Sequence, residues 1–265
     1  MLLIDRVQEA YGGLDRWRTL SSFTAHVSIS GAALPPPEHR PPAGMTPVAV
    51  QDYLLPTARY TNPTLREFVV EGDTTRPLVR LYSAGDLNRY CVYTPERIEF
   101  RDRNDRVLEV LEKPLDSFRS NAEGAPFTPL QRGLIFGAIL WEAIVGPFMM
   151  CQPSVRCVER GLGDRRGPGE RILEVATPSS VDPLVSARTQ RFDASHFLER
   201  SEYDLETLRL GSVVDAASAH AGFCGIIVPT LRRLSKASDQ AGRPSALIDL
   251  EIFDVRFCSG ADAAF

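Results

Sequence analysis

Lysine is nearly absent from this 265-residue chain, occurring only at Lys113 and Lys236, so almost all of the positive charge is arginine. With 30 Lys and Arg against 34 Asp and Glu, the formal net charge is −4, and no block of basic residues stands out. Proteins bind nucleic acids mainly through clustered basic side chains that neutralise phosphates. We therefore expect no nucleic-acid partner.

Motifs for cofactors and for common nucleophiles are also missing. The chain contains no P-loop, GxGxxG, HExxH or nucleophile-elbow pattern. Its five cysteines include no CxxC pair, and its four histidines are scattered, whereas a zinc site needs several such ligands at short spacing. We therefore expect neither a metal ion nor a cofactor. We expect the cysteines to be free thiols, which suit a reducing compartment.

The chain shows neither a secretory leader nor a clear membrane span. Charges at Asp5 and Arg6 fall where a signal peptide would need an apolar run, so we expect a cytoplasmic location. The one long apolar segment, Leu130–Val145, contains Glu142 and is followed by Pro147. Its uncharged run is shorter than the ~20 residues that a membrane span requires.

Alternation of apolar and polar residues predicts strands over most of the chain. From Phe23 to Ile29 the two kinds alternate with the period of a half-buried strand. Further strand-like runs are separated by turn residues, and such a meander is typical of an antiparallel sheet. These runs are Val48–Leu55, Leu65–Glu71, Leu78–Ser83, Asn88–Thr94, Arg97–Asp102, Val107–Lys113, Ser154–Arg160, Glu170–Ala176, Leu184–Phe192, Phe197–Tyr203, Phe223–Val228 and Ala246–Phe257.

One helix interrupts the strands. Thr128 is a good N-cap, Pro129 suits the first helical position, and Gly146-Pro147 predicts the end, which gives a helix at about 129–145. Because this helix is apolar nearly all round, we expect it to be buried. The sequence predicts a mainly β (α+β) fold in one domain spanning 1–265. In it, a large curved antiparallel sheet forms a half-open barrel around the buried helix, with a Pro-rich surface loop or lid at 31–46.

Several stretches match a known bacterial family in their order and spacing. They are Gly12–Trp17, Arg97–Phe100, Lys113–Phe118, Thr128–Phe148, Phe192–Tyr203, Gly225–Arg233 and Leu247–Asp254. The chain resembles a family of actinobacteria and proteobacteria whose fold is similar to that of the LolA/LolB lipoprotein carriers. The resemblance implies an antiparallel half-barrel with helices that plug its open face.

The chain departs from that family in the centre. Leu130 stands where relatives often carry Trp, Glu142-Ala143 replaces an Asn-Tyr pair, and Phe223-Cys224-Gly225 replaces Phe-Asp-Gly. If these positions line the interior, the cavity has been altered, so the resemblance predicts the scaffold better than the ligand. Lipoprotein carriage belongs to exported proteins, and we expect a different task here.

Three residues are candidates for acid–base chemistry. Glu142 follows Trp141 on the apolar helix, so it is either paired with an arginine from a neighbouring strand or buried with a raised pKa that suits a general acid. His220 matches a position where relatives tend to carry His. His26 lies on the polar face of the first strand, which either lines the interior or faces solvent.

Aromatic and sulfur-containing side chains are candidates for contacting a ligand. Tyrosine offers an apolar wall with a polar tip, and methionine adapts to irregular cavities, although both residue types are also common in cores. The candidate ligand-binding residues are Trp141, Tyr82, Tyr90, Tyr93, Phe148 and Met149.

Two functions remain open from these observations. One is a carrier or binding protein that holds a small, largely hydrophobic molecule in an internal cavity of the half-barrel. The alternative is a cofactor-independent cyclase or isomerase of natural-product metabolism, which would use the same cavity with Glu142 or His220 as the acid–base group. A purely structural role is a third, weaker interpretation.

Overall fold

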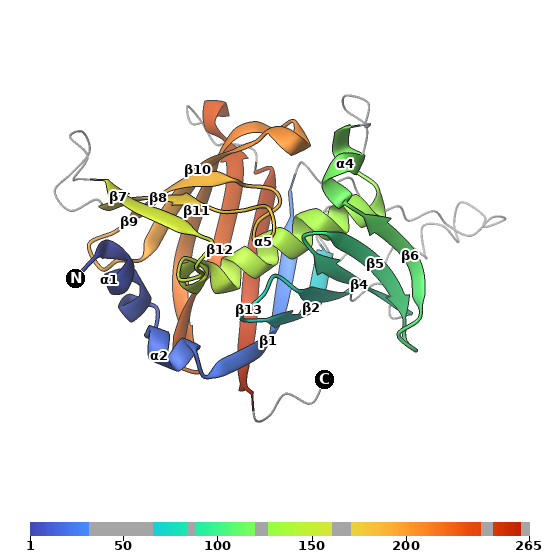
Figure 1. The fold of residues 1–265 in the computed structure, drawn as a ribbon, viewed down its shortest axis with the longest axis horizontal. Coiled ribbons are helices and arrows are strands. Elements are labelled where there is room, and N and C mark those ends of the chain that lie inside the picture. The colour runs from blue at the N-terminus through green and yellow to red at the C-terminus, as the bar shows by residue number, and fades with distance from the viewer. Residues whose placement is uncertain (32–65, 84–87, 120–126, 161–170, 240–245, 261–265) are drawn as a thin grey trace, which may run out of the picture.

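The computed structural model describes residues 1–31, 66–83, 88–119, 127–160, 171–239 and 246–260. Within them a single antiparallel sheet of thirteen strands curves around one long helix (Figure 1). The strands are β1 Leu20–Ser30, β2 Arg66–Asp73, β3 Val79–Ser83, β4 Arg89–Thr94, β5 Arg97–Asp102, β6 Val107–Glu112, β7 Arg156–Arg160, β8 Arg171–Ala176, β9 Ala187–Phe192, β10 Leu198–Leu205, β11 Gly211–Phe223, β12 Ile226–Lys236 and β13 Ile248–Ser259. The helices are α1 Leu3–Ala10, α2 Leu14–Trp17, α4 Pro114–Arg119 and α5 Pro129–Met149, with 3-10 turns η2 Glu206–Leu208 and η3 Ala237–Asp239.

The strand order shows how the chain builds this sheet. It runs β6-β5-β4-β3-β2-β1-β13-β12-β11-β10-β9-β8-β7, so two meanders meet where β1 pairs with β13. The strands β6 and β7 are the two edges, and the chain between them is the part that contains α4 and α5. The sheet is therefore half-open, and α5 crosses its concave face from one edge towards the other (Figure 1). The predicted fold class is confirmed.

Helix α5 begins as the sequence predicts but ends later. The Thr128 hydroxyl accepts the Gln131 N–H at 3.2 Å, and the Gln131 side chain accepts the Thr128 N–H at 2.9 Å, a reciprocal cap. The predicted end at Gly146-Pro147 is wrong, because the helix continues to Met149. A proline in the last turn removes only one helical hydrogen bond, and Phe148, which follows it, is buried.

Two glycines bring α5 close to β4. A Cβ atom on Gly137 would lie 2.2 Å from the Tyr93 ring, and one on Gly133 would lie 2.6 Å from the sulfur of Cys91. Glycine has no Cβ atom, so it lets the backbone of α5 come this close to the side chains of β4 without a shift of the helix. Among the described residues, α5 alone is long and apolar enough to cross a membrane, and most of it is buried inside the protein.

The N-terminal helices pack where β12 and β13 diverge. Strands β12 and β13 pair only from Leu231 to Leu234, and the preceding part of β12 contains Pro229, which donates no ladder hydrogen bond. Next to it, the Ile227 N–H donates to the carbonyl of Tyr11 at 3.0 Å. The Trp17 ring stacks on Phe148 with centroids 4.3 Å apart. Helices α1 and α2 thus join the sheet to the end of α5.

Several predicted boundaries need correction. The run Phe223–Val228 is not one strand, because a turn at Cys224-Gly225 separates β11 from β12, and β11 was not predicted at all. Helix α4 was not predicted either. Apart from Gly31, the loop at 31–46 and the strand Val48–Leu55 lie outside the described residues.

Candidate functional site

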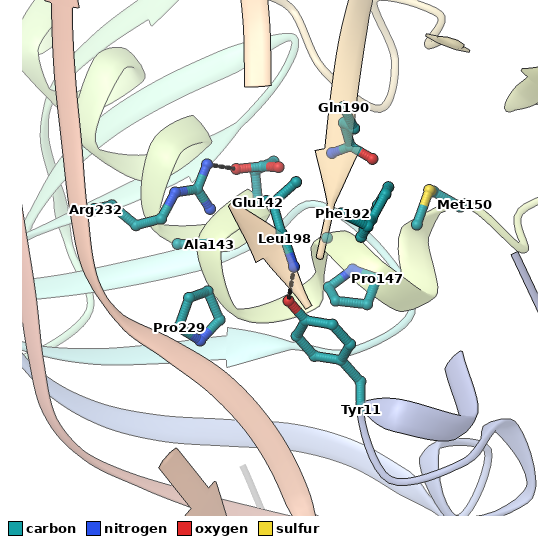
Figure 2. A pocket seen from close by; sticks show the side chains of 11 residues that line it. Tyr11, Glu142, Ala143, Pro147, Met150, Gln190, Phe192, Leu198, Pro229 and Arg232 are labelled. Carbon is teal, nitrogen blue, oxygen red and sulfur yellow. Dashed lines mark hydrogen bonds and ion pairs between the residues drawn. The ribbon is translucent and has the colours of Figure 1, made fainter. Parts of the chain in front are cut away.

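Glu142 is the centre of a buried charged cluster beneath α5. Its carboxylate lies between two guanidinium groups, with Oε1 3.0 Å from Nη1 of Arg188 on β9 and Oε2 2.8 Å from Nη2 of Arg232 on β12. Glu142 is 7% exposed, and the arginines are 4% and 3% exposed. Charge-assisted contacts of this kind are the stronger hydrogen bonds in proteins, so they fasten α5 to two strands. Figure 2 shows the contact between Glu142 and Arg232.

Two more carboxylates complete the cluster. Asp182 bonds the Nη2 atom of Arg188, and Asp215 on β11 accepts the Nε–H of Arg232 at 3.0 Å. Asp182 also accepts two backbone N–H groups, at 2.9 and 3.1 Å. Three carboxylates thus face two guanidinium groups, and all five side chains are buried.

The carboxyl groups of Glu142 and Asp182 shift their pKa values in opposite directions in this environment. Burial acts to raise the pKa of Glu142, but the charges of Arg232 and Arg188 outweigh it and lower that pKa. Burial raises the pKa of Asp182, in spite of its Arg188 partner. For Arg232, burial is outweighed by Asp215 and Glu142, which hold its pKa well above the ordinary value. Glu142 is therefore a carboxylate held in its ionised form, with no proton to donate.

Some polar atoms beside the cluster lack a partner within the described residues. They are Nε of Arg188, Oε1 of Gln190 on β9 and Oγ of Ser201 on β10, and all three belong to buried side chains. Gln190 pairs with Ser201 in the sheet register, and Ser201 pairs with Asp215. The inner face of β9–β11 therefore carries polar side chains beneath α5 among apolar ones such as Phe192 and Val213. Unbonded atoms here are unusual, because buried polar groups are nearly always bonded.

The spaces around the cluster are small. One, between Tyr11, Glu142 and Arg232, has a volume of about 10 Å³ (Figure 2), and another, between Glu142, Asp182 and Tyr203, has about 20 Å³. Each has room for about one water molecule. Beside the cluster, the described residues thus show no apolar cavity of ligand size, because side chains of α5 occupy this part of the concave face. Larger hollows of about 480 and 420 Å³ lie over outward-pointing residues such as Arg233 and Asp204.

Comparison with known proteins gives structural neighbours only. No protein-family model and no curated protein matches the chain. Three solved structures cover nearly all of it. A DUF1329 family protein from Desulfovibrio piger has a TM-score of 0.53 at 10% identity and covers 97% of this chain and 92% of its own. An outer membrane lipoprotein-sorting protein domain from Vibrio parahaemolyticus has a TM-score of 0.51 at 10% identity, and the match covers 97% of this chain and 92% of that one. A LolA superfamily protein from Nitrosomonas europaea has a TM-score of 0.50 at 11% identity, and the match covers 98% of this chain and 95% of that one. The fold is LolA-like.

Within this LolA-like scaffold, the three predicted acid–base residues do not come together. Glu142 is paired with arginines of neighbouring strands, which was the first of the two interpretations of the sequence, and it is also buried. His220 lies with its Nε2 atom 3.1 Å from the hydroxyl of Tyr11, and burial lowers its pKa. His26 is exposed beside Phe253. A catalytic role for any of them stays a prediction, and Glu142 is in the wrong state for a general acid.

The predicted ligand-binding residues divide between the two faces of the sheet. Tyr82 and Tyr90 stack on each other on the outer face, with centroids 4.9 Å apart, where they do not contact α5. Tyr93 is on the inner face against Gly137. Trp141, Phe148 and Met149 are buried on α5, and the Trp141 indole donates to the carbonyl of Asp73 at 2.8 Å.

Sequence reasoning missed the arginines that hold Glu142. Arg232 lies an even number of residues from the apolar Val228 and Leu234, so all three side chains point to the same face of β12, which is the buried face. An arginine in an apolar phase is a sequence signal for a buried ion pair. Arg188 gave no such signal, because its neighbours in phase include Gln190.

Proposed function

We propose that this LolA-like protein binds a small hydrophobic molecule between α5 and the concave face of the sheet, as a carrier or binding protein. The observation that carries the proposal is the position of α5, an apolar helix that occupies the open side of a half-barrel. The fold it shares with an outer membrane lipoprotein-sorting protein domain supports the same interpretation. Since α5 fills the site, a ligand would enter by displacing part of this helix.

The first half of α5 is the part that we expect to move. There its contacts with the sheet are mostly apolar, such as Phe136 against Phe68, with centroids 5.6 Å apart, and Gly137 against Tyr93. Apolar contacts to a helix are readily exchanged for contacts to an alkyl chain, because burial stabilises either one by about 25 cal/mol per Å². The second half is held by the ion pairs of Glu142, so it leaves the sheet only where another acceptor takes the place of that carboxylate.

A disulfide between α5 and β4 tests this proposal. In Gly133→Cys, the new Cβ would lie 2.6 Å from the native Cys91 sulfur, so α5 must first shift slightly away from β4. The two cysteines would then be close enough for mild oxidation to join helix to strand. Uptake of the neutral fluorescent probe N-phenyl-1-naphthylamine would be measured in the oxidised and reduced forms of the same protein. We expect the oxidised form to bind the probe at least about tenfold more weakly, and reductant to restore binding.

Two controls separate the staple from the substitution. Gly133→Ser has a side chain of similar size but forms no disulfide, and Gly133→Cys combined with Cys91→Ser removes the partner sulfur. Both should bind the probe equally with and without oxidant. Failure of the reduced protein to bind the probe, or equal binding by a form shown by mass to be cross-linked, would count against the proposed site.

A further inference from the structure

Arg188 and Arg232 keep their places on the sheet independently of α5. Arg188 is held by Asp182, which is itself fixed by two backbone N–H groups, and Arg232 is held by Asp215 on the neighbouring strand. Glu142 is the single member of this cluster that comes from the helix. Displacement of α5 would therefore remove one carboxylate and leave two oriented guanidinium groups facing the concave side.

The inner face of the sheet changes character beside these arginines. The inward side chains of β1–β4 are apolar apart from the Tyr93 hydroxyl, whereas those of β9–β11 include Arg188, Gln190, Ser201 and Asp215 among apolar neighbours. Within the described part of the chain, one polar atom each of Gln190 and Ser201 has no hydrogen-bond partner. The apolar inward residues are Phe23, Ala25, Val27, Ile29, Phe68, Val70, Val79, Leu81, Cys91 and Tyr93. Such a surface complements a molecule with a long apolar part and one polar end.

From this geometry we infer that the ligand is an amphiphile with a terminal carboxylate, which binds Arg188 and Arg232 in the place of the Glu142 side chain. The inference rests on the proposed function and names its ligand class. Glu142 supplies two oxygens to two different arginines, and a carboxylate provides the same pair of acceptors. The charge of the cluster is preserved, because one carboxylate replaces another.

Other headgroups fit these positions less well. An alcohol offers one oxygen where Glu142 offers two, so one buried guanidinium donor would lose its acceptor. An ammonium group would face two like charges. A methyl ester has two oxygens but no charge, so it lacks the Coulomb attraction of a carboxylate for the two guanidinium groups.

The test compares ligands that share one alkyl chain. Dodecanoate, dodecan-1-ol and methyl dodecanoate would each be tested for displacement of N-phenyl-1-naphthylamine from the unmodified protein, at concentrations at which each is dissolved as single molecules. We expect dodecanoate to bind at least about tenfold more tightly than the other two. In Arg188→Met this preference should vanish while the affinity for dodecan-1-ol is kept. Arg233→Met, which changes an exposed arginine next to Arg232, should keep the preference.

A second measurement does not depend on an apolar ligand. In Glu142→Ala the two arginines lose their shared acceptor, and added propionate should raise the melting temperature more than propionamide does. The unmodified protein should show no such difference. This arm stands if Arg188→Met does not fold. Glu142→Ser, which also leaves space between the two arginines, replaces Glu142→Ala if the latter does not fold.

The outcomes distinguish the two proposals. Probe uptake with equal displacement by dodecanoate and dodecan-1-ol would overturn the carboxylate inference and leave hydrophobic binding intact. Absence of probe uptake would overturn the proposed function, and the propionate measurement would then decide the arginine site by itself. No stabilisation of Glu142→Ala by propionate would overturn that site.

Discussion

The indole of Trp17 and the ring of Phe148 lie parallel, 4.3 Å apart and inclined by only 5°, although 131 residues separate them in the chain. Trp17 ends α2 and Phe148 lies in the last turn of α5. Phe257 of β13 meets the same indole edge-on at 5.8 Å. This stack fixes the end of α5 to the N-terminal helices, so the end of the helix that follows Glu142 is anchored at a second place.

Gly137→Ala should destabilise the protein, even though alanine favours helices by about 1 kcal/mol over glycine. The new Cβ would lie 2.2 Å from the Tyr93 ring, so the helix must move away from β4. We expect the free energy of unfolding to fall by about 1–3 kcal/mol in urea denaturation. In the control Gly222→Ala the Cβ meets only the tip of Ile227 at 3.4 Å, and little change is expected. Equal stability of the two variants would contradict the close packing of α5.

Glu142→Gln should lower stability by about 3 kcal/mol near neutral pH, because it leaves two buried guanidinium groups without their shared charged partner. Folding lowers the pKa of Glu142 from its ordinary value of 4.5, so the unfolded chain binds the proton more tightly than the folded one. The stabilisation is therefore complete above pH 4.5 and is lost as the pH falls towards the lower, folded-state pKa.

The difference between the native protein and Glu142→Gln should therefore shrink as the pH is lowered from about 6. Denaturation in urea at a series of pH values measures it. Glu199→Gln, which changes an exposed position of β10, serves as the control and should differ little from the native protein at every pH. A difference that grows in acid would show that the carboxylate is protonated in the folded state.

Tyr11→Phe should destabilise the protein by about 1–3 kcal/mol, because it leaves a buried donor without an acceptor. The Tyr11 hydroxyl accepts the N–H of Leu198 at 3.0 Å and lies beside His220. Tyr82→Phe is the matched control, since the Tyr82 hydroxyl bonds the half-buried Glu71 and water can replace it. Thermal unfolding of the two variants tests the difference, and a larger loss in Tyr82→Phe would refute this assignment.

Cys91 should resist thiol reagents in the folded protein, whereas the exposed Cys224 reacts quickly. Burial raises the pKa of Cys91 to about 12, and the sulfur lies beneath Gly133 of α5. Because the thiolate is the reactive form, labelling of Cys91 should follow opening of the helix. The rate of labelling by a chromogenic disulfide, compared between the native protein and Cys91→Ser, would measure this opening. A rapid labelling phase that is absent from Cys91→Ser would contradict the buried position.

The sequence predicts those elements whose residues follow one local rule. The cap at Thr128 and the alternation around Val27 indicated α5 and β1 because capping and burial act through near neighbours. Strand β11 was missed because small residues and the buried Asp215 interrupt its alternation. Pro229 obscured β12, because a proline fits a strand only where the neighbouring strand has parted from it, and that parting is a tertiary feature.

The candidate site was predictable in part. An arginine partner for Glu142 follows from the high free energy of an unpaired buried charge, but the choice of Arg188 and Arg232 depends on which strands lie under α5. The faces of β1 were equally undecided: alternation placed His26 opposite Val27, and only the position of α5 determines which of them is inside. The filled interior depends on side-chain packing between distant segments.

The pairing of β1 with β13 has a consequence for how the protein is made. On the ribosome, the six strands β1–β6 are synthesised before β13, and among the described strands β1 gains its second neighbour only when β13 arrives. The strands β7–β12 form the second meander, and the edge of β12 likewise gains its neighbour only when β13 arrives. An unpaired edge readily joins other chains, so the nascent protein passes through a stage in which two half-sheets are exposed to aggregation. Strand β13, emerging last of the thirteen, ends that stage by closing both edges at once.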